Sequence, residues 1–200
     1  MSQQFGFDRG EPIDRYYITE FIAKYCHDIK GHVMECGDRR YTRFGGKRVK
    51  KSDVLMPLKS DSESTIIADL SSAVDIPENT FDSIILTQVL HCVYNVRCAI
   101  NTIHRILKPG GVVLVTLPSI TKADQSYTWP FLWGFTFDSA RRLFEEEFGS
   151  EQVEMHLYGN IVSATAFLYG LAAHEIQLKE LNYLDPNFQV IIGVRAKKSS

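Results

Sequence analysis

Residues 81–118 read FDSIILTQVLHCVYNVRCAINTIHRILKPGGVVLVTLP and decide the fold. They begin with residues 82–87, whose apolar centre suits a strand buried on both faces of a sheet. Apolar residues then recur every three or four positions over 96–107, which predicts a helix with Asn95 as its N-terminal cap. After a Lys-Pro-Gly-Gly turn, a second apolar strand follows at 112–117. Such a strand–helix–strand unit is a right-handed parallel crossover, so the fold is α/β.

Five more strands are expected along the chain, at residues 32–36, 48–53, 65–69, 152–157 and 188–194. Further helices are expected from Ile13 onward, over 138–148 and over most of 160–181. Only ten residues separate Gly37 from Arg48, and ten separate Asp53 from Ser64. Such gaps are too short for a helix and its two turns, so we expect reduced helices after the first two strands. The N-terminal helix or a second subunit is then expected to cover that part of the sheet.

Composition limits the class of protein. The 200 residues are 44% hydrophobic, enough for the core of one domain. A net charge of −2 disfavours nucleic acid as a partner; the basic run at 39–51 fits a solvated rim better than a nucleic-acid patch. The sequence contains neither an apolar stretch of about 20 residues nor the apolar core of a signal peptide, so no membrane partner is expected. Four cysteines without a CxxC pair predict free thiols and a cytoplasmic location.

Short motifs follow one another in a characteristic order. They are RGEPIDRYY at 9–17, GDRRYTRFGG at 37–46, SDVL at 52–55, ILTQVLH at 85–91, LKPGG at 107–111 and YGN at 158–160. This set resembles class I S-adenosylmethionine (SAM)-dependent methyltransferases, in particular the small methyltransferase domains found with bacterial glycosyltransferases and natural-product enzymes. The resemblance implies a Rossmann-like sheet of seven strands with the last strand antiparallel. We expect an N-terminal arm and capping helix over 1–30, and the methyltransferase domain over 31–197.

The resemblance also implies where SAM binds. Glu35 and Gly37 end the first strand, as the acidic-x-Gly element that begins the SAM loop does in the family. The further glycines of that loop are absent here, which leaves the contacts with the methionine part of SAM open. Asp53, following the second strand, is expected to accept hydrogen bonds from both ribose hydroxyls. A turn aspartate is the alternative for Asp53.

Two further strand ends and the N-terminal segment complete the expected cofactor site. Asp69 and Leu70, after the third strand, match the acid that meets the adenine amino group and the residue that packs on the ring, although Asp69 also fits a helix cap. Thr87 and Gln88, after the fourth strand, are expected beside the sulfonium. From the N-terminal segment, Arg15 and Tyr16 are expected to cover the cofactor, and a basic residue there suits the methionine carboxylate. Helix capping and surface packing are the alternative for that segment.

His91 is the candidate general base, because it lies four residues beyond the fourth strand and imidazole has an ordinary pKa near neutrality. A histidine that makes only structural hydrogen bonds is the alternative. An aromatic segment is expected to line the acceptor pocket or close over it, through Tyr127, Trp129, Trp133 and Phe135. No tight cluster of His, Asp and Glu points to a metal.

These observations predict a SAM-dependent methyltransferase acting on a hydroxyl or carboxylate oxygen of a small molecule or natural-product intermediate, derived from a sugar or a peptide. N-methylation stays open. A SAM-fold binding or scaffold module without turnover is the first alternative. A Rossmann oxidoreductase is the second, and the missing GxGxxG motif disfavours it. A homodimer, or fusion to another biosynthetic domain, is the expected assembly.

Overall fold

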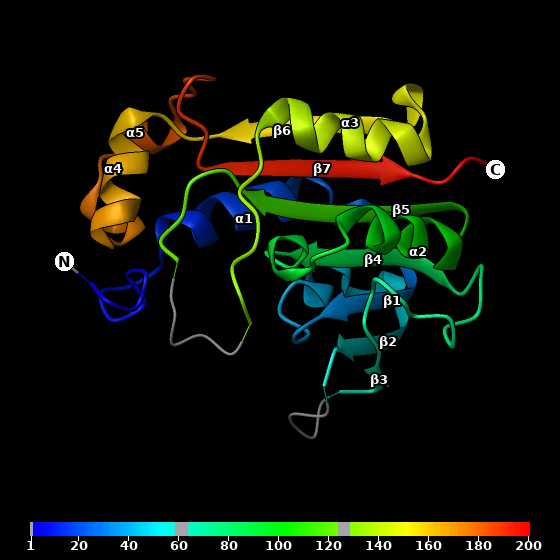
Figure 1. Cartoon of the computed structure of the whole chain (residues 1–200). Helices are drawn as coiled ribbons and strands as arrows, with labels where there is room; N and C mark the ends of the chain where they lie inside the picture. Colours follow the sequence, from blue (N-terminus) through cyan, green and yellow to red (C-terminus); the bar gives the residue numbers. More distant parts are fainter. Residues whose placement is uncertain (1, 59–63, 124–128) are drawn as a thin grey trace.

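The computed structural model describes residues 2–58, 64–123 and 129–200. The described residues form one sheet of seven strands in the order β3-β2-β1-β4-β5-β7-β6 (Figure 1). The strands are β1 (Gly31–Cys36), β2 (Val49–Met56), β3 (Ile66–Ile67), β4 (Phe81–Thr87), β5 (Leu107–Pro118), β6 (Val153–Tyr158) and β7 (Ile191–Lys197). Neighbouring strands from β3 to β5 are parallel, and β7 is antiparallel to both β5 and β6. The expected α/β sheet with an antiparallel last strand is therefore confirmed.

Helices cover both faces of this sheet. In Figure 1, α2 (Val96–Ile106) and α3 (Phe137–Phe148) lie in front of the sheet and α1 (Ile13–Lys24) lies behind it. The side chain of Asn95 accepts a hydrogen bond from the backbone of Cys98 at 3.3 Å, which confirms the expected cap of α2. Two shorter helices, α4 (Ile161–Tyr169) and α5 (Leu178–Asn182), stand at one end of the sheet.

Helix α1 is an integral part of the core. Its residues Ile13, Ile18, Phe21 and Ile22 are fully buried and pack in one cluster with residues of β1, β4, β5 and β7. Contact with β7 is so close that a Cβ added at Gly193 would lie 2.6 Å from the Phe21 ring. The N-terminal helix thus covers the middle of the sheet.

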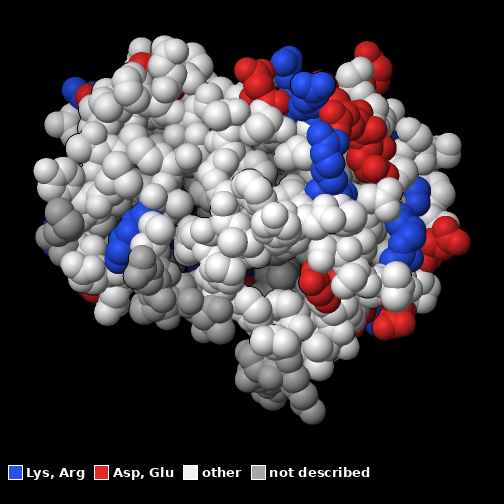
Figure 2. All heavy atoms as spheres, viewed as in Figure 1, with Lys and Arg blue, Asp and Glu red and all other residues white. Residues whose placement is uncertain are grey.

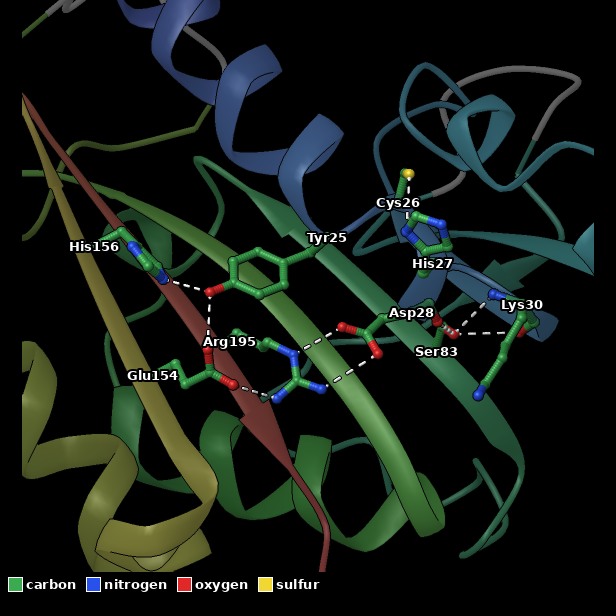
Figure 3. A network of polar contacts seen from close by, with 9 residues as sticks. All are labelled: Tyr25, Cys26, His27, Asp28, Lys30, Ser83, Glu154, His156 and Arg195. Carbon is green, nitrogen blue, oxygen red and sulfur yellow. Dashed lines mark hydrogen bonds and ion pairs between the residues drawn. The ribbon is translucent and has the colours of Figure 1, made fainter. Parts of the chain in front are cut away.

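A polar network fastens the C-terminal end of α1 to the sheet (Figure 3). From β7, Arg195 donates to both carboxylate oxygens of Asp28, at 2.7 and 3.3 Å, and to Glu154 of β6 at 2.7 Å. The hydroxyl of Tyr25 donates to the other oxygen of Glu154 at 2.9 Å and contacts His156. Residues just beyond α1 are therefore tied to the two strands at the far edge.

The crossovers after β1 and β2 are short, as expected. A 3-10 helix, Thr42–Arg48, takes the place of an α-helix between β1 and β2. The described residues between β2 and β3, which are 57, 58, 64 and 65, contain no helix. Residues 68–80, between β3 and β4, also form only turns. Chain length explains the first two cases, because a helix with two turns does not fit in ten residues.

Several expected boundaries are wrong. Strand β2 continues to Met56, three residues beyond the expected end, because the apolar residues after Asp53 extend it. Strand β3 has two residues where five were expected. The last strand begins at Ile191, later than expected, and the expected helix over 160–181 is divided into α4 and α5.

Two further properties concern the length of the helices and the state of the cysteines. Among the described residues, no helix combines the length and apolar character that crossing a membrane requires. All four cysteines are free thiols, namely Cys26, Cys36, Cys92 and Cys98.

Candidate active site

A cavity of about 750 Å³ lies at the carboxyl ends of the parallel strands. Its walls come from the residues that follow β1, β2, β3 and β4, from the end of β5, from the start of α1 and from α4. This is the end of an α/β sheet at which ligands bind, and the volume suits a small-molecule site. Figure 2 shows charged side chains gathered over α3, whereas the left half of the same face, toward α4, carries few.

Glu35 organises the loop after β1 without entering the cavity. Its side chain is almost fully buried, and its carboxylate accepts hydrogen bonds from the backbone N–H of Tyr41 at 2.9 Å and of Thr42 at 2.7 Å. The hydroxyl of Thr42 donates to the same carboxylate at 2.7 Å. Burial raises the pKa of Glu35 against these stabilising bonds. The sequence predicts that Glu35 contacts SAM, but in the structure its side chain holds the loop after β1 and does not line the cavity.

Gly37 lines the cavity at the end of β1, as expected. Its φ of +99° is one that side chains rarely allow, and a Cβ built on it would meet nothing within 4 Å. The backbone at this position is therefore open to a ligand. Glycine is required here by conformation, since space alone would admit a side chain.

The expected place of Asp53 is wrong. It lies inside β2 and not after it, and it does not line the cavity. Its carboxylate pairs with His32 Nε2 at 2.5 Å and accepts a hydrogen bond from Thr65 Oγ1 at 2.8 Å. Partial burial raises the pKa of Asp53, but these bonds outweigh it and the pKa is lowered. At the true end of β2, Met56 and Pro57 line the cavity, so no described residue there offers a carboxylate to a ribose.

Asp69 and Leu70 line the cavity after β3, where the sequence places them. One carboxylate oxygen of Asp69 accepts hydrogen bonds from the backbone N–H and the hydroxyl of Ser71, both at 2.8 Å. Asp69 therefore holds a turn, and no helix follows it. Leu70 is nearly buried and offers an apolar surface beside that turn.

Thr87 and Gln88 line the cavity at the end of β4. Gln88 has a φ of +56°, an uncommon conformation for a residue with a side chain. Its backbone N–H donates to Thr116 on β5 at 3.0 Å, while its side-chain Nε2 is buried without a hydrogen-bond partner. Strain and an unpaired buried donor at one residue are features of a ligand site.

His91 also lines the cavity, in the 3-10 turn Leu90–Cys92. Its side chain is buried, its Nδ1 has no hydrogen-bond partner, and its ring lies 4.6 Å from that of Phe131. Burial, with the charge of Arg15 as a second cause, lowers the pKa of His91 to about 4. His91 is therefore neutral at neutral pH and, as a base, weaker than an ordinary histidine.

Of the two N-terminal residues expected over the cofactor, only Arg15 lines the cavity. Its Nε lies 3.9 Å from Asp14 and has no hydrogen-bond partner. Tyr16 does not line the cavity, and its hydroxyl donates to Asn182 at 2.8 Å. A cation without full hydrogen bonding therefore stands at one wall of the cavity.

The aromatic segment contributes to the cavity in part. Trp129 lines it as expected, whereas Trp133 donates from Nε1 to the carbonyl of Val93 at 3.0 Å, and Phe135 packs in the core. These last two residues are not among those that line the cavity. Tyr127 lies outside the described residues. Phe131, within the same expected segment, also lines the cavity, whereas sequence reasoning missed Phe5, Phe7 and Phe167, which line it as well.

Comparison with known proteins agrees with this geometry. Residues 38–115 match the family model of a methyltransferase domain. Comparison with curated proteins gives no match. Solved structures share the fold. A SAM-dependent methyltransferase of Archaeoglobus fulgidus has a TM-score of 0.60 at 9% identity, over 98% of this chain and 100% of that one.

Two other structures differ in the reactions that their names describe. The 1,6-didemethyltoxoflavin-N1-methyltransferase of Burkholderia thailandensis, solved with S-adenosylhomocysteine, has a TM-score of 0.58 at 12% identity, over 96% of this chain and 80% of that one. The 4+2 cyclase SpnF has a TM-score of 0.56 at 15% identity, over 93% and 81% of the two chains. The chain therefore has the fold of SAM-dependent methyltransferases, and its residues 38–115 are similar to a methyltransferase domain.

Proposed function

We propose that the chain binds SAM across the ends of β1, β3 and β4 and transfers its methyl group to a hydroxyl or carboxylate oxygen of a small molecule. One observation carries the proposal. The open backbone of Gly37, the strained Gln88 and the buried His91 all line one cavity, and Gln88 and His91 each carry a buried polar atom without a hydrogen-bond partner. Unpaired buried polar atoms are costly, and a ligand that pairs with them offsets this cost.

The described residues suit a cationic methyl donor. SAM supplies a methyl group on a positively charged sulfur; as the acceptor oxygen bonds to that carbon, the carbon–sulfur electron pair stays on sulfur. Gln88 and a neutral His91 offer dipoles next to this charge, whereas a protonated histidine would repel it. For a hydroxyl acceptor, the released proton goes to Nδ1 of His91 or to water; a carboxylate acceptor releases none. Much of the rate would then come from alignment.

A binding module without turnover is the second candidate. The cavity lacks a carboxylate at the end of β2 among its described residues, and the loop after β1 has lost the later glycines of the family pattern. The cyclase that shares the fold is an example of the same architecture serving another reaction.

Calorimetric titration with SAM, S-adenosylhomocysteine and NAD tests the proposal. We expect dissociation constants of about 1–100 μM for the first two and no binding of NAD. Failure of both SAM species to bind would refute the proposal. Binding without release of S-adenosylhomocysteine, over a broad set of hydroxyl and carboxylate acceptors, would favour the second candidate.

The acceptor class and the assembly complete the proposal. A natural-product intermediate is proposed as acceptor, in the cytoplasm, where the four free cysteines would stay reduced. A homodimer is also proposed, supported by exposed apolar side chains on α4 and α5, such as Tyr169 and Leu178. Sedimentation velocity over a range of concentrations tests it, and a monomer throughout would contradict it.

A further inference from the structure

The cavity has two chemically different halves. One half, formed by α1 and by the residues after β1 and β3, carries the ionisable residues Asp14, Arg15, Asp38, Arg40 and Asp69. The other half is formed by the N-terminal arm (residues 2–12), residues 120–121, residues 129–132 and Phe167 of α4. None of the described residues that line this second half is Lys, Arg, Asp or Glu. Among the described lining residues, charged side chains thus belong to the half assigned to the cofactor, although the guanidinium of Arg15 also lies 5.9 Å from the centre of the Phe7 ring.

The two halves meet at His91. The ring of Phe131 lies 4.6 Å from that of His91, with 42° between the two planes. The backbone carbonyl of His91 accepts hydrogen bonds from the N–H groups of Leu132 and Trp133, at 2.9 and 3.1 Å. These bonds fix the aromatic wall relative to the end of β4. A molecule packed on Phe131 would therefore lie close to the ring of His91.

A further wall of the cavity, the N-terminal arm, is held in place by distant parts of the chain. The backbone N–H of Ser2 donates to Tyr169 at 3.1 Å, and Pro12 pairs with Ala172 in an isolated bridge. Arg9 makes an ion pair with Glu175. These contacts anchor both ends of the arm to α4 and to the residues that follow it.

Within the arm, Phe5 is held in an unfavourable conformation. Its φ is +57°, a value uncommon for an aromatic residue. The ammonium of Lys122 lies 5.1 Å from the centre of its ring and donates to the carbonyl of Gln3 at 2.7 Å. Strained residues of this kind persist where the surroundings fix them, and they are common at ligand sites. Phe5 is therefore part of a built wall.

We propose that this second half binds a flat, uncharged aromatic acceptor that carries a hydroxyl group. Its ring would pack between the phenylalanines of the arm and Phe131, with the hydroxyl toward Nδ1 of His91. The inference rests on the proposed function and names its substrate class. On transfer, the acceptor oxygen forms the new bond to carbon, the carbon–sulfur bond breaks toward sulfur, and the hydroxyl proton leaves to His91 or water.

Other acceptors fit this half less well. A carboxylate or phosphate would lose its hydration among these aromatic rings. The nearby cations, Lys122 at 5.1 Å from the Phe5 ring and Arg15 at 5.9 Å from the Phe7 ring, are not among the described residues that line this half. A sugar could stack on the rings, but its several hydroxyl groups would lack partners. An aromatic ring gains offset or edge-to-face contacts there and needs only one polar partner. The balance of these effects favours a neutral phenol.

Three probes test the inference in the full chain saturated with S-adenosylhomocysteine. They are 1-naphthol, 1-naphthoate and methyl glucoside, with affinities measured by calorimetry. We expect naphthol to bind at least about tenfold more tightly than either of the others. Phe5→Ala and Phe131→Ala should each weaken naphthol binding about tenfold and change the affinity for S-adenosylhomocysteine less than about twofold. Phe131→Leu, which keeps apolar bulk without a ring, should fall between.

Phe188→Ala is the matched control, because this phenylalanine is 42% exposed and does not line the cavity. It should leave naphthol binding unchanged. Equal or tighter binding of naphthoate or the glucoside, or unchanged naphthol affinity in both alanine variants, overturns the inference. Absence of S-adenosylhomocysteine binding instead overturns the proposed function, so the two failures are distinguished.

Discussion

At the scale of single residues, His91 links the candidate site to the stability of the fold. Its buried ring has a pKa of about 4, whereas in the unfolded chain it has the ordinary value of about 6.5. Between these two values the unfolded chain binds a proton that the folded protein does not. The free energy of unfolding therefore falls as pH falls through this window, and this loss is complete below a pH of about 4.

The first prediction follows from this difference. From pH 7 to pH 4, His91 should lower the free energy of unfolding by about 3 kcal/mol, and His91→Gln should abolish that part of the loss. Urea unfolding of both proteins at the two pH values measures it, since the other titrating groups cancel in the comparison. Equal pH dependence of the two proteins would show that His91 is not buried in its neutral form.

Gln88 supports a second prediction at this scale. Gln88→Gly should relieve the positive φ and change the free energy of unfolding by no more than about 1 kcal/mol, in either direction, because glycine also adds freedom to the unfolded chain. Affinity for S-adenosylhomocysteine should nevertheless fall about tenfold through loss of the side-chain amide. Gln88→Asn, which tolerates the same backbone conformation, is the control and should bind better than the glycine variant. Urea unfolding measures the change in stability, and calorimetric titration measures the change in affinity for S-adenosylhomocysteine.

At the scale of elements, the end of β1 depends on one buried carboxylate. Glu35→Gln should lower the free energy of unfolding by about 1–3 kcal/mol, because an amide can satisfy fewer of the bonds from Tyr41 and Thr42. The same substitution should also raise the dissociation constant for S-adenosylhomocysteine, although Glu35 does not line the cavity. Calorimetry on the folded variant measures this effect. An unchanged dissociation constant would mean that the loop keeps its shape without the carboxylate.

The network between α1 and β6–β7 gives a prediction for element packing. Arg195→Lys should lower the free energy of unfolding by about 2 kcal/mol, since lysine cannot donate twice to Asp28 while bonding Glu154. Arg141→Lys is the control, because its ion pair with Asp138 is exposed and its loss should change stability by less than about 0.5 kcal/mol. Urea unfolding of the two variants measures this difference in stability. Similar losses of stability in both variants would mean that the Arg195 network contributes no more than an exposed ion pair.

The sequence predicts the elements better than their ends. Periodicity located β4, α2 and β5, because burial on one or both faces leaves a strong pattern. It failed at β2, where Lys50, Lys51 and Asp53 suggested an end, although the strand continues through Val54 and Leu55. This error displaced the expected ribose ligand. An exposed half of an edge-proximal strand tolerates charge, and no local signal marks where such a strand stops.

The candidate site likewise contains residues that the sequence locates well and residues that it does not. Gly37, Asp69, Leu70, Thr87, Gln88 and His91 line the cavity because each follows a strand end, a position that the sequence reveals. Trp133 and Phe135 were misplaced because an irregular segment has no periodicity to tell which ring faces inward. Phe5 and Phe7 were missed, since only contacts with residues about 165 positions away bring the arm to the cavity.

At the scale of the whole molecule, the arm contributes more to the cavity than to the core. Among residues 2–10, Ser2 and Gly6 are buried, Phe5 is half-buried and the others are exposed, so deletion of residues 2–11 should lower the free energy of unfolding by less than about 2 kcal/mol. The same deletion should weaken naphthol binding at least about tenfold, because both phenylalanines are lost. Urea unfolding and calorimetry of the deletion variant give the two values. A large loss of stability would make the arm a structural element instead.

The place of β7 in the sheet has a consequence for how the protein is made. This strand is the last element in the chain, yet it lies between β5 and β6. Until residues 191–197 have left the ribosome, β6 has no partner in the sheet, and Phe21 of α1 lacks the surface of Gly193. From the emergence of β5 until that of residues 191–197, the nascent chain therefore carries an open edge on β5 and an uncovered helix face. Its dependence on molecular chaperones should be greatest just before the final strand emerges.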